Sequence, residues 1–199
     1  MGEYWLFLFN DNILIMVLMY VILGGGIKYI DAAFDEKIYN KQHAIILAPF
    51  LGFFWTITMM VSQVFSTILL AVVLCVLFKG KIDNKAHLIG LLSIFFLTYI
   101  FQIKPIIPTL IFLTAAAVLD EVGHDIITYN KNILKTKLFS HQFIKYFFGR
   151  RYMVKIALIY LIILGFISAE YFIAFLAFDE AYLMIGLLSE VKQKKINPT

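Results

Sequence analysis

The sequence predicts an all-α integral membrane protein: a single domain over residues 1–199, built as a bundle of about seven transmembrane helices. Of its 199 residues, 62% are hydrophobic and 17% are aromatic, and the mean hydropathy is +0.88. These values lie outside the range of soluble globular proteins and are typical of polytopic membrane proteins. Long apolar stretches that alternate with a few charge-rich segments then set the number of helices.

Seven apolar stretches are expected to span the membrane, although several are shorter than the ~20 residues of a full span. They cover residues 5–27, 44–60, 62–79, 86–102, 105–119, 152–168 and 170–189. The first stretch has no basic lead and no small-residue cleavage site. We therefore expect it to be a retained helix and not a signal peptide.

Positive charge predicts the orientation of this bundle. Of the 17 Lys and Arg residues, all but Lys104 lie in or beside the segments 28–43, 80–85 and 120–151, or in the C-terminal tail. With seven spans these segments share one face, which the positive-inside rule assigns to the cytoplasm. We expect a multi-pass protein of the cell membrane, with its N-terminus outside and its C-terminus cytoplasmic. Because orientation explains the positive charge, nothing supports nucleic-acid binding.

Residues 132–151 differ from the spans, because apolar and basic side chains alternate there at helical spacing. The apolar set is Ile133, Leu134, Leu138, Phe139, Phe143, Tyr146 and Phe147, and the basic set is Lys135, Lys137, His141, Lys145, Arg150 and Arg151. This pattern predicts a cytoplasmic amphipathic helix that contacts membrane lipids in the headgroup region. Such a helix either anchors the chain or covers a site as a lid.

The first acidic cluster reads Asp31-x-x-x-Asp35-Glu36 and follows a run of three glycines. On a helix, Asp31 and Asp35 lie on one face, where both carboxylates can approach one cation. Carboxylate oxygens are the ligands of hard cations such as Mg²⁺, which usually also binds a phosphate-bearing substrate. The glycines allow a close approach of backbone or substrate. The alternative is a solvated segment whose Asp, Glu and Lys side chains pair with one another.

The second acidic cluster, Asp120-Glu121-x-x-His124-Asp125, follows the fifth apolar stretch. Glu121 and Asp125 are four residues apart, as are Asp120 and His124, so each pair shares one helical face. The spacing of Glu121 and His124 matches the E-x-x-H pair of di-iron bundle proteins, but the sequence holds no second copy. Since both acidic clusters are expected on the cytoplasmic face, we expect them to build one site.

Asp179 and Glu180 lie inside the last apolar stretch. Each carboxylate in a membrane helix costs roughly 2.5–3.5 kcal/mol, so we expect both to face the bundle interior or a cavity. They either form a hydrogen bond to a neighbouring helix or act near an acceptor or in a proton path. His43, His87 and His141 lie near predicted membrane interfaces, and we interpret them as structural.

The order of these features resembles the UbiA superfamily of intramembrane aromatic prenyltransferases. Tyr29-Ile30-Asp31, Asp35 and Asn40-Lys41 are similar to the family's first motif, and the second acidic cluster occupies the place of its second motif. The run Phe78-Lys79-Gly80-Lys81 is similar to the family's basic loop. The chain departs from the family at Ile27, Lys28 and Gln42, where the first motif has Asn, Asp and Pro, and the second motif reads E-x-x-x-D.

The resemblance implies Mg²⁺-dependent transfer of a polyprenyl group from its diphosphate to a lipid-soluble aromatic or hydroxyl acceptor. It assigns the metal to Asp31, Asp35, Asp120, Glu121 and Asp125, catalysis to Asp31, Asp35 and Asp125, and the diphosphate to Lys41, Lys79 and Lys81. Two alternatives remain open. One is a non-catalytic membrane scaffold or lipid-binding relative, and the other is an ion- or proton-coupled transporter.

Overall fold

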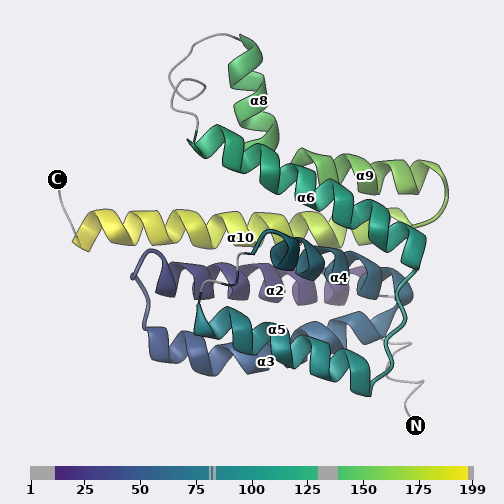
Figure 1. Cartoon of the computed structure of the whole chain (residues 1–199), viewed down its shortest axis with the longest axis horizontal. Helices are drawn as coiled ribbons and strands as arrows, with labels where there is room; N and C mark the ends of the chain where they lie inside the picture. Colours follow the sequence, from purple (N-terminus) through teal and green to yellow (C-terminus); the bar gives the residue numbers. More distant parts are fainter. Residues whose placement is uncertain (1–11, 81, 83, 130–138, 197–199) are drawn as a thin grey trace. The chain divides into compact units, whose positions relative to one another are not determined.

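The computed structural model describes residues 12–80, 82, 84–129 and 139–196, and every regular element among them is an α-helix (Figure 1). In this part of the chain the helices are α2 (Ile13–Phe34), α3 (Lys41–Val61), α4 (Gln63–Phe78), α5 (Lys85–Ile100), α6 (Ile107–Tyr129), α8 (Phe139–Gly149), α9 (Tyr152–Ile163) and α10 (Ala169–Ile196). The prediction of an all-α protein is therefore confirmed for the described residues.

The described residues fall into two compact units. Unit 1 takes those within residues 1–66, 82–104 and 170–199, and so holds α2, α3, the start of α4, α5 and α10. Unit 2 takes those within residues 67–81 and 105–169, and so holds the rest of α4 together with α6, α8 and α9. In unit 1, α3 packs against α2 and α5; in unit 2, α6 packs against α8 and α9.

Among the described residues, three helices are long and apolar enough to cross a membrane: α2, α3 and the part of α10 from Ala169 to Lys195. The helices α4, α5 and α9 are apolar but shorter. The 12 residues of α9 extend only ~18 Å at the helical rise, less than the ~30 Å hydrocarbon core of a bilayer. A bundle of seven spans and its orientation remain predictions, whereas three candidate spans are compatible with a membrane protein.

Helix α2 is apolar on both of its faces. Its inner face is buried and includes Met16, Met19, Tyr20 and Leu23. On the outer face Leu14, Leu18 and Ile22 follow one another at intervals of one turn, and each is more than half exposed. A helix that is apolar all round belongs either in the core of a large protein or in lipid. The outer stripe of α2 is therefore compatible with contact to acyl chains.

The helices that carry the two acidic clusters, α2 and α6, continue beyond the apolar stretches. Helix α2 continues beyond residue 27 to Phe34, and the N–H of its C-cap residue, Asp35, donates to the Asp31 carbonyl at 2.8 Å. Helix α6 continues beyond residue 119 to Tyr129. Charged residues lower the local hydropathy without breaking a helix, so the apolar stretches end before the helices do.

The glycine run does not end α2, because two of its glycines lie where the helix meets its neighbours in unit 1. A Cβ on Gly24 would overlap the carbonyl oxygen of Phe178 in α10, and a Cβ on Gly26 would lie 2.6 Å from Cδ1 of Leu51 in α3. A Cβ on Gly25 would lie 3.6 Å from Cγ1 of Ile185, an ordinary contact. The glycines thus allow close approach, as expected, and the approach is between helices.

The predicted amphipathic segment is described from residue 139, where α8 begins, and residues 130–138 lie outside the described part. Phe143 and Tyr146 are more than half exposed, and Lys145 is exposed between them. The ring of Phe148 occupies the space that a Cβ on Gly123 of α6 would need. An amphipathic helix is therefore present, and its placement in the headgroup region stays a prediction.

Replacing Gly24 by Ala is expected to destabilise the protein by about 1–3 kcal/mol, the usual effect of overpacking a tight contact. The new methyl group would meet backbone of α10, which cannot move aside like a flexible side chain. The matched control is Gly25→Ala, which adds the same methyl group at an ordinary contact distance and improves helix propensity by about 1 kcal/mol. Thermal unfolding in detergent compares the two variants; equal melting temperatures would contradict the packing described here.

Candidate functional site

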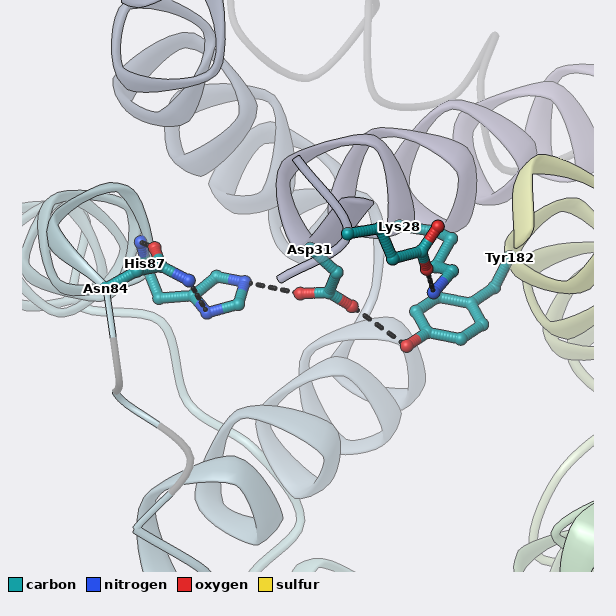
Figure 2. A network of polar contacts seen from close by, with 6 residues as sticks. Lys28, Asp31, Asn84, His87 and Tyr182 are labelled. Atoms are coloured by element: carbon teal, nitrogen blue, oxygen red, sulfur yellow. Dashed lines mark hydrogen bonds and ion pairs between the residues drawn. The ribbon is translucent and has the colours of Figure 1, made fainter. Parts of the chain in front are cut away.

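Asp31 of the first acidic cluster lies in a polar network that joins α2, α5 and α10 of unit 1 (Figure 2). Its Oδ1 lies 2.8 Å from Nε2 of His87, and its Oδ2 accepts a hydrogen bond from the Tyr182 hydroxyl at 2.8 Å. The Asp31 and His87 side chains are only 16% and 19% exposed. One carboxylate is thus held on both oxygens by side chains from two other helices.

Asn84 holds the other side of the His87 ring. It is the N-cap of α5, and its Oδ1 accepts the His87 backbone N–H at 2.8 Å. Its Nδ2 lies 2.9 Å from Nδ1 of the ring. Asn is a preferred N-cap residue because its side chain satisfies an amide at the helix start. The start of α5 therefore fixes the imidazole against Asp31.

A lysine–glutamate pair adjoins the network. Nζ of Lys28 lies 2.6 Å from Oε1 of Glu36 and 5.6 Å from the centre of the Tyr182 ring. Lys28 lies three residues before Asp31 in the chain, so the first acidic cluster has a cation beside it. Oε2 of Glu36 is buried and accepts no hydrogen bond from the described residues. Together, Asp31 and Glu36 offer the carboxylate oxygens that suit a hard cation.

Two other predicted site residues of unit 1 lie at its surface. Asp35 is exposed at the C-cap of α2, one turn after Asp31. Lys41 is exposed at the start of α3, with its Nζ 5.5 Å from the centre of the Phe34 ring. Asp31 and Asp35 are therefore one helical turn apart at the end of α2, and Lys41 lies beyond the short loop that follows.

In unit 2, Asp120 caps the N-terminus of α9. Its Oδ1 accepts the Met153 N–H at 3.0 Å and its Oδ2 accepts the Val154 N–H at 2.8 Å, while the residue is only 1% exposed. The N-cap residue itself, Arg151, provides no side-chain cap. Burial raises the pKa of Asp120, which lies past the expected span, and the two amide hydrogen bonds oppose that rise. Both carboxylate oxygens thus serve α9.

The other acidic residues of the second cluster have cationic partners within unit 2. Oε1 of Glu121 lies 2.8 Å from Nη2 of Arg151, and Oδ2 of Asp125 lies 2.6 Å from Nζ of Lys79. The resemblance assigns Lys79 and Lys81 to a diphosphate. Lys79 pairs with Asp125 of the second acidic cluster, and Lys81 lies outside the described residues.

No three His, Cys, Asp or Glu side chains in the described part of the chain are grouped so that they could hold a metal ion. The acidic residues are instead distributed as the network around Asp31, the cap formed by Asp120 and two ion pairs. Of the acidic pair in α10, Asp179 is buried and Glu180 is exposed. Neighbouring helical positions point about 100° apart, so only one of the two faces inward.

Two members of the Asp31 network, Lys28 and Tyr182, carry little signal in the sequence. Tyr182 is 151 positions from Asp31, and nothing local marks it among eleven tyrosines. Lys28 reads as one more basic residue of a charge-rich segment. His87 differs from them, because Asn84 stands three positions before it and an Asn at the start of an apolar stretch is an N-cap signal.

Comparisons of this chain with family models, with curated proteins and with solved structures gave no match.

Replacing Asp120 by Asn is expected to destabilise the protein by about 1–2 kcal/mol, because an amide can accept only one of the two α9 hydrogen bonds. Hydrogen–deuterium exchange should become faster at Met153 and Val154. The matched control is Asp125→Asn, whose partly exposed ion pair with Lys79 should contribute less than about 1 kcal/mol. Unchanged exchange at the start of α9 in Asp120→Asn would show that the carboxylate is not its cap.

Proposed function

We propose that this chain is an integral membrane prenyltransferase, which transfers a polyprenyl group from its diphosphate to a lipid-soluble aromatic or hydroxyl acceptor. The Asp31 network carries the proposal, since a carboxylate held on both oxygens is kept among otherwise apolar helices. Ionisable groups in membrane helices are costly and usually functional. The resemblance in motif order supplies the reaction class.

The proposal assigns the metal to acidic residues within each unit taken by itself. In unit 1 these are Asp31 and Asp35. In unit 2 they are Glu121 and Asp125, while Asp120 keeps its role at the start of α9. Mg²⁺ held by such carboxylates would neutralise the charge on a diphosphate leaving group.

The side chains around Asp31 have roles that follow from their chemistry. His87 and Tyr182 hold the carboxylate in one orientation through one hydrogen bond each. Lys28 and the exposed Lys41 place positive charge where a diphosphate would bring negative charge. The face of the Tyr182 ring already lies beside a cation, the Lys28 ammonium.

Asp31→Asn should lower prenyl transfer by at least ~100-fold, the scale of losing one group that acts on the transition state. Glu190→Gln, which changes an exposed acidic residue of the same α10 that carries Tyr182, should leave the rate unchanged. The assay uses protein in nanodiscs, Mg²⁺ or a chelator, a labelled prenyl diphosphate and a panel of aromatic and hydroxylated lipid acceptors.

Two outcomes of this assay would count against the enzyme or against the role of Asp31. If the unaltered protein with Mg²⁺ gives neither transfer nor diphosphate release over the whole panel, the enzyme proposal is abandoned in favour of a scaffold or lipid-binding role. If both activities occur but Asp31→Asn and Glu190→Gln behave alike, the reaction class stands and its assignment to the Asp31 network is wrong.

A transporter is the second candidate, and the burial of Asp179 inside α10 favours it. Asp179 is 6% exposed in a helix that is long and apolar enough to cross a membrane. A transporter should move protons or cations into liposomes, and Asp179→Asn should reduce that flux at least ~10-fold, as expected when an intramembrane carrier of charge is removed. Glu180→Gln, at the adjacent exposed position, is the control; equal flux from both variants would exclude this role for Asp179.

A further inference from the structure

The two polar atoms of the Asn84 side chain face different groups of His87. Oδ1 accepts the His87 backbone N–H at 2.8 Å and so closes the first turn of α5. Nδ2, which can only donate, lies 2.9 Å from Nδ1 of the ring. Turning the amide over would put Nδ2 against the backbone N–H, donor against donor, and would remove the cap. The helix start therefore fixes which atom of Asn84 faces the ring.

We infer that Asn84 holds His87 as the neutral tautomer with its proton on Nε2, and that His87 is thereby a positioning residue for Asp31. A donor at 2.9 Å requires Nδ1 to be an acceptor, so Nδ1 carries no proton. The single ring proton then lies on Nε2, 2.8 Å from Oδ1 of Asp31. This chain of contacts links the cap of α5 to the orientation of a carboxylate on α2 (Figure 2).

Every other protonation state of the ring conflicts with a neighbour. A proton on Nδ1 alone would point at Nδ2 of Asn84 and would leave the lone pair of Nε2 against the Asp31 carboxylate. The imidazolium would satisfy Asp31 but would still set Nδ1–H against Nδ2–H. Nδ1–H of His87 and Nδ2–H of Asn84 could both be accommodated only if Asn84 gave up its hydrogen bond to the His87 backbone N–H. Of the three protonation states of the His87 ring, only the tautomer with its proton on Nε2 is compatible with these neighbours.

This assignment sets the roles of His87 and Asp31. In hydrolase triads an acidic residue orients a histidine whose second ring nitrogen is open to accept a proton from the nucleophile. Here Asn84 covers that second nitrogen, so His87 orients Asp31 and does not act as a base. Asp31 receives hydrogen bonds from two neutral donors, His87 and Tyr182. Neither donor brings a positive charge to the carboxylate.

Nitrogen-15 NMR of the whole protein in nanodiscs, labelled only at histidine, tests the inference at neutral pH. The chain has four histidines, and the resonances absent from His87→Gln are those of His87. We expect Nδ1 of His87 to resonate as an unprotonated nitrogen and Nε2 as a protonated one. A protonated Nδ1, alone or together with Nε2, would overturn the inference.

Asn84→Asp provides a matched test, because Asp is as good an N-cap as Asn but would present an oxygen to the ring. Nδ1 could then donate to this carboxylate while Nε2 still donates to Asp31. Both His87 nitrogens should shift to protonated positions, a change that a merely structural cap would not produce. If the folded variant keeps the spectrum of the unaltered protein, Asn84 does not set the tautomer; if it does not fold, the unaltered protein alone decides.

The inference does not depend on the proposed prenyl transfer, since the spectra are recorded without substrate. A failed transfer assay with the expected tautomer would remove the enzyme and keep the positioning role. Transfer that depends on Asp31, together with a protonated Nδ1, would keep the enzyme and remove the role given to Asn84.

Discussion

Each unit of this protein contains an aspartate whose two carboxylate oxygens both accept hydrogen bonds from groups on other helices. In unit 1, the carboxylate of Asp31 in α2 contacts the His87 ring of α5 and the Tyr182 hydroxyl of α10. In unit 2, the carboxylate of Asp120 in α6 accepts hydrogen bonds from two backbone N–H groups of α9. A carboxylate among apolar helices must be satisfied in this way, because an unpaired buried charge is costly. The requirement fixes which helices lie together at these points.

In lipid, such contacts help to decide which helices lie side by side. Acyl chains are as apolar as leucine, so burying apolar side chains gives membrane helices little reason to choose one neighbour over another. Small residues and polar contacts therefore determine their arrangement. Gly24 brings the backbone of α2 against that of α10, and the hydrogen bond between Asp31 and Tyr182 joins the same two helices. Close packing and the polar contact reinforce each other within unit 1.

The sequence predicts those features of the fold that depend on local pattern. Apolar stretches indicate helices, the glycine run indicates a close approach, and the four-residue spacing of Asp31 and Asp35 places them one turn apart. The helix ends are less predictable, since α2 and α6 continue through charged residues that hydropathy alone reads as boundaries. Gly165, with a φ of 74°, marks the turn after α9 that the apolar stretch 152–168 hides.

The candidate site is harder to predict from the sequence, because the side chains that contact one another there are distant in the chain. The pair Asp31 and Tyr182 depends on how α10 packs against α2, and the cap formed by Asp120 depends on how α9 begins beside α6. An acidic residue in a D-x-x-x-D or D-E pattern reads alike whether it binds a metal, caps a helix or pairs with a lysine. Only the three-dimensional contacts separate these roles, and they separate Asp31 from Asp120.

The difference between the two aspartates lies in their donors. The amides of Met153 and Val154 belong to the first turn of α9 and have no partner inside their own helix. They cannot leave Asp120 without becoming unsatisfied, so this carboxylate is committed to its cap. Asp31 is held by a histidine ring and a phenol, and the Tyr182 hydroxyl can turn toward another acceptor by rotating one bond. Of the two, Asp31 is therefore the carboxylate that can exchange a partner for a ligand while the helices around it stay folded.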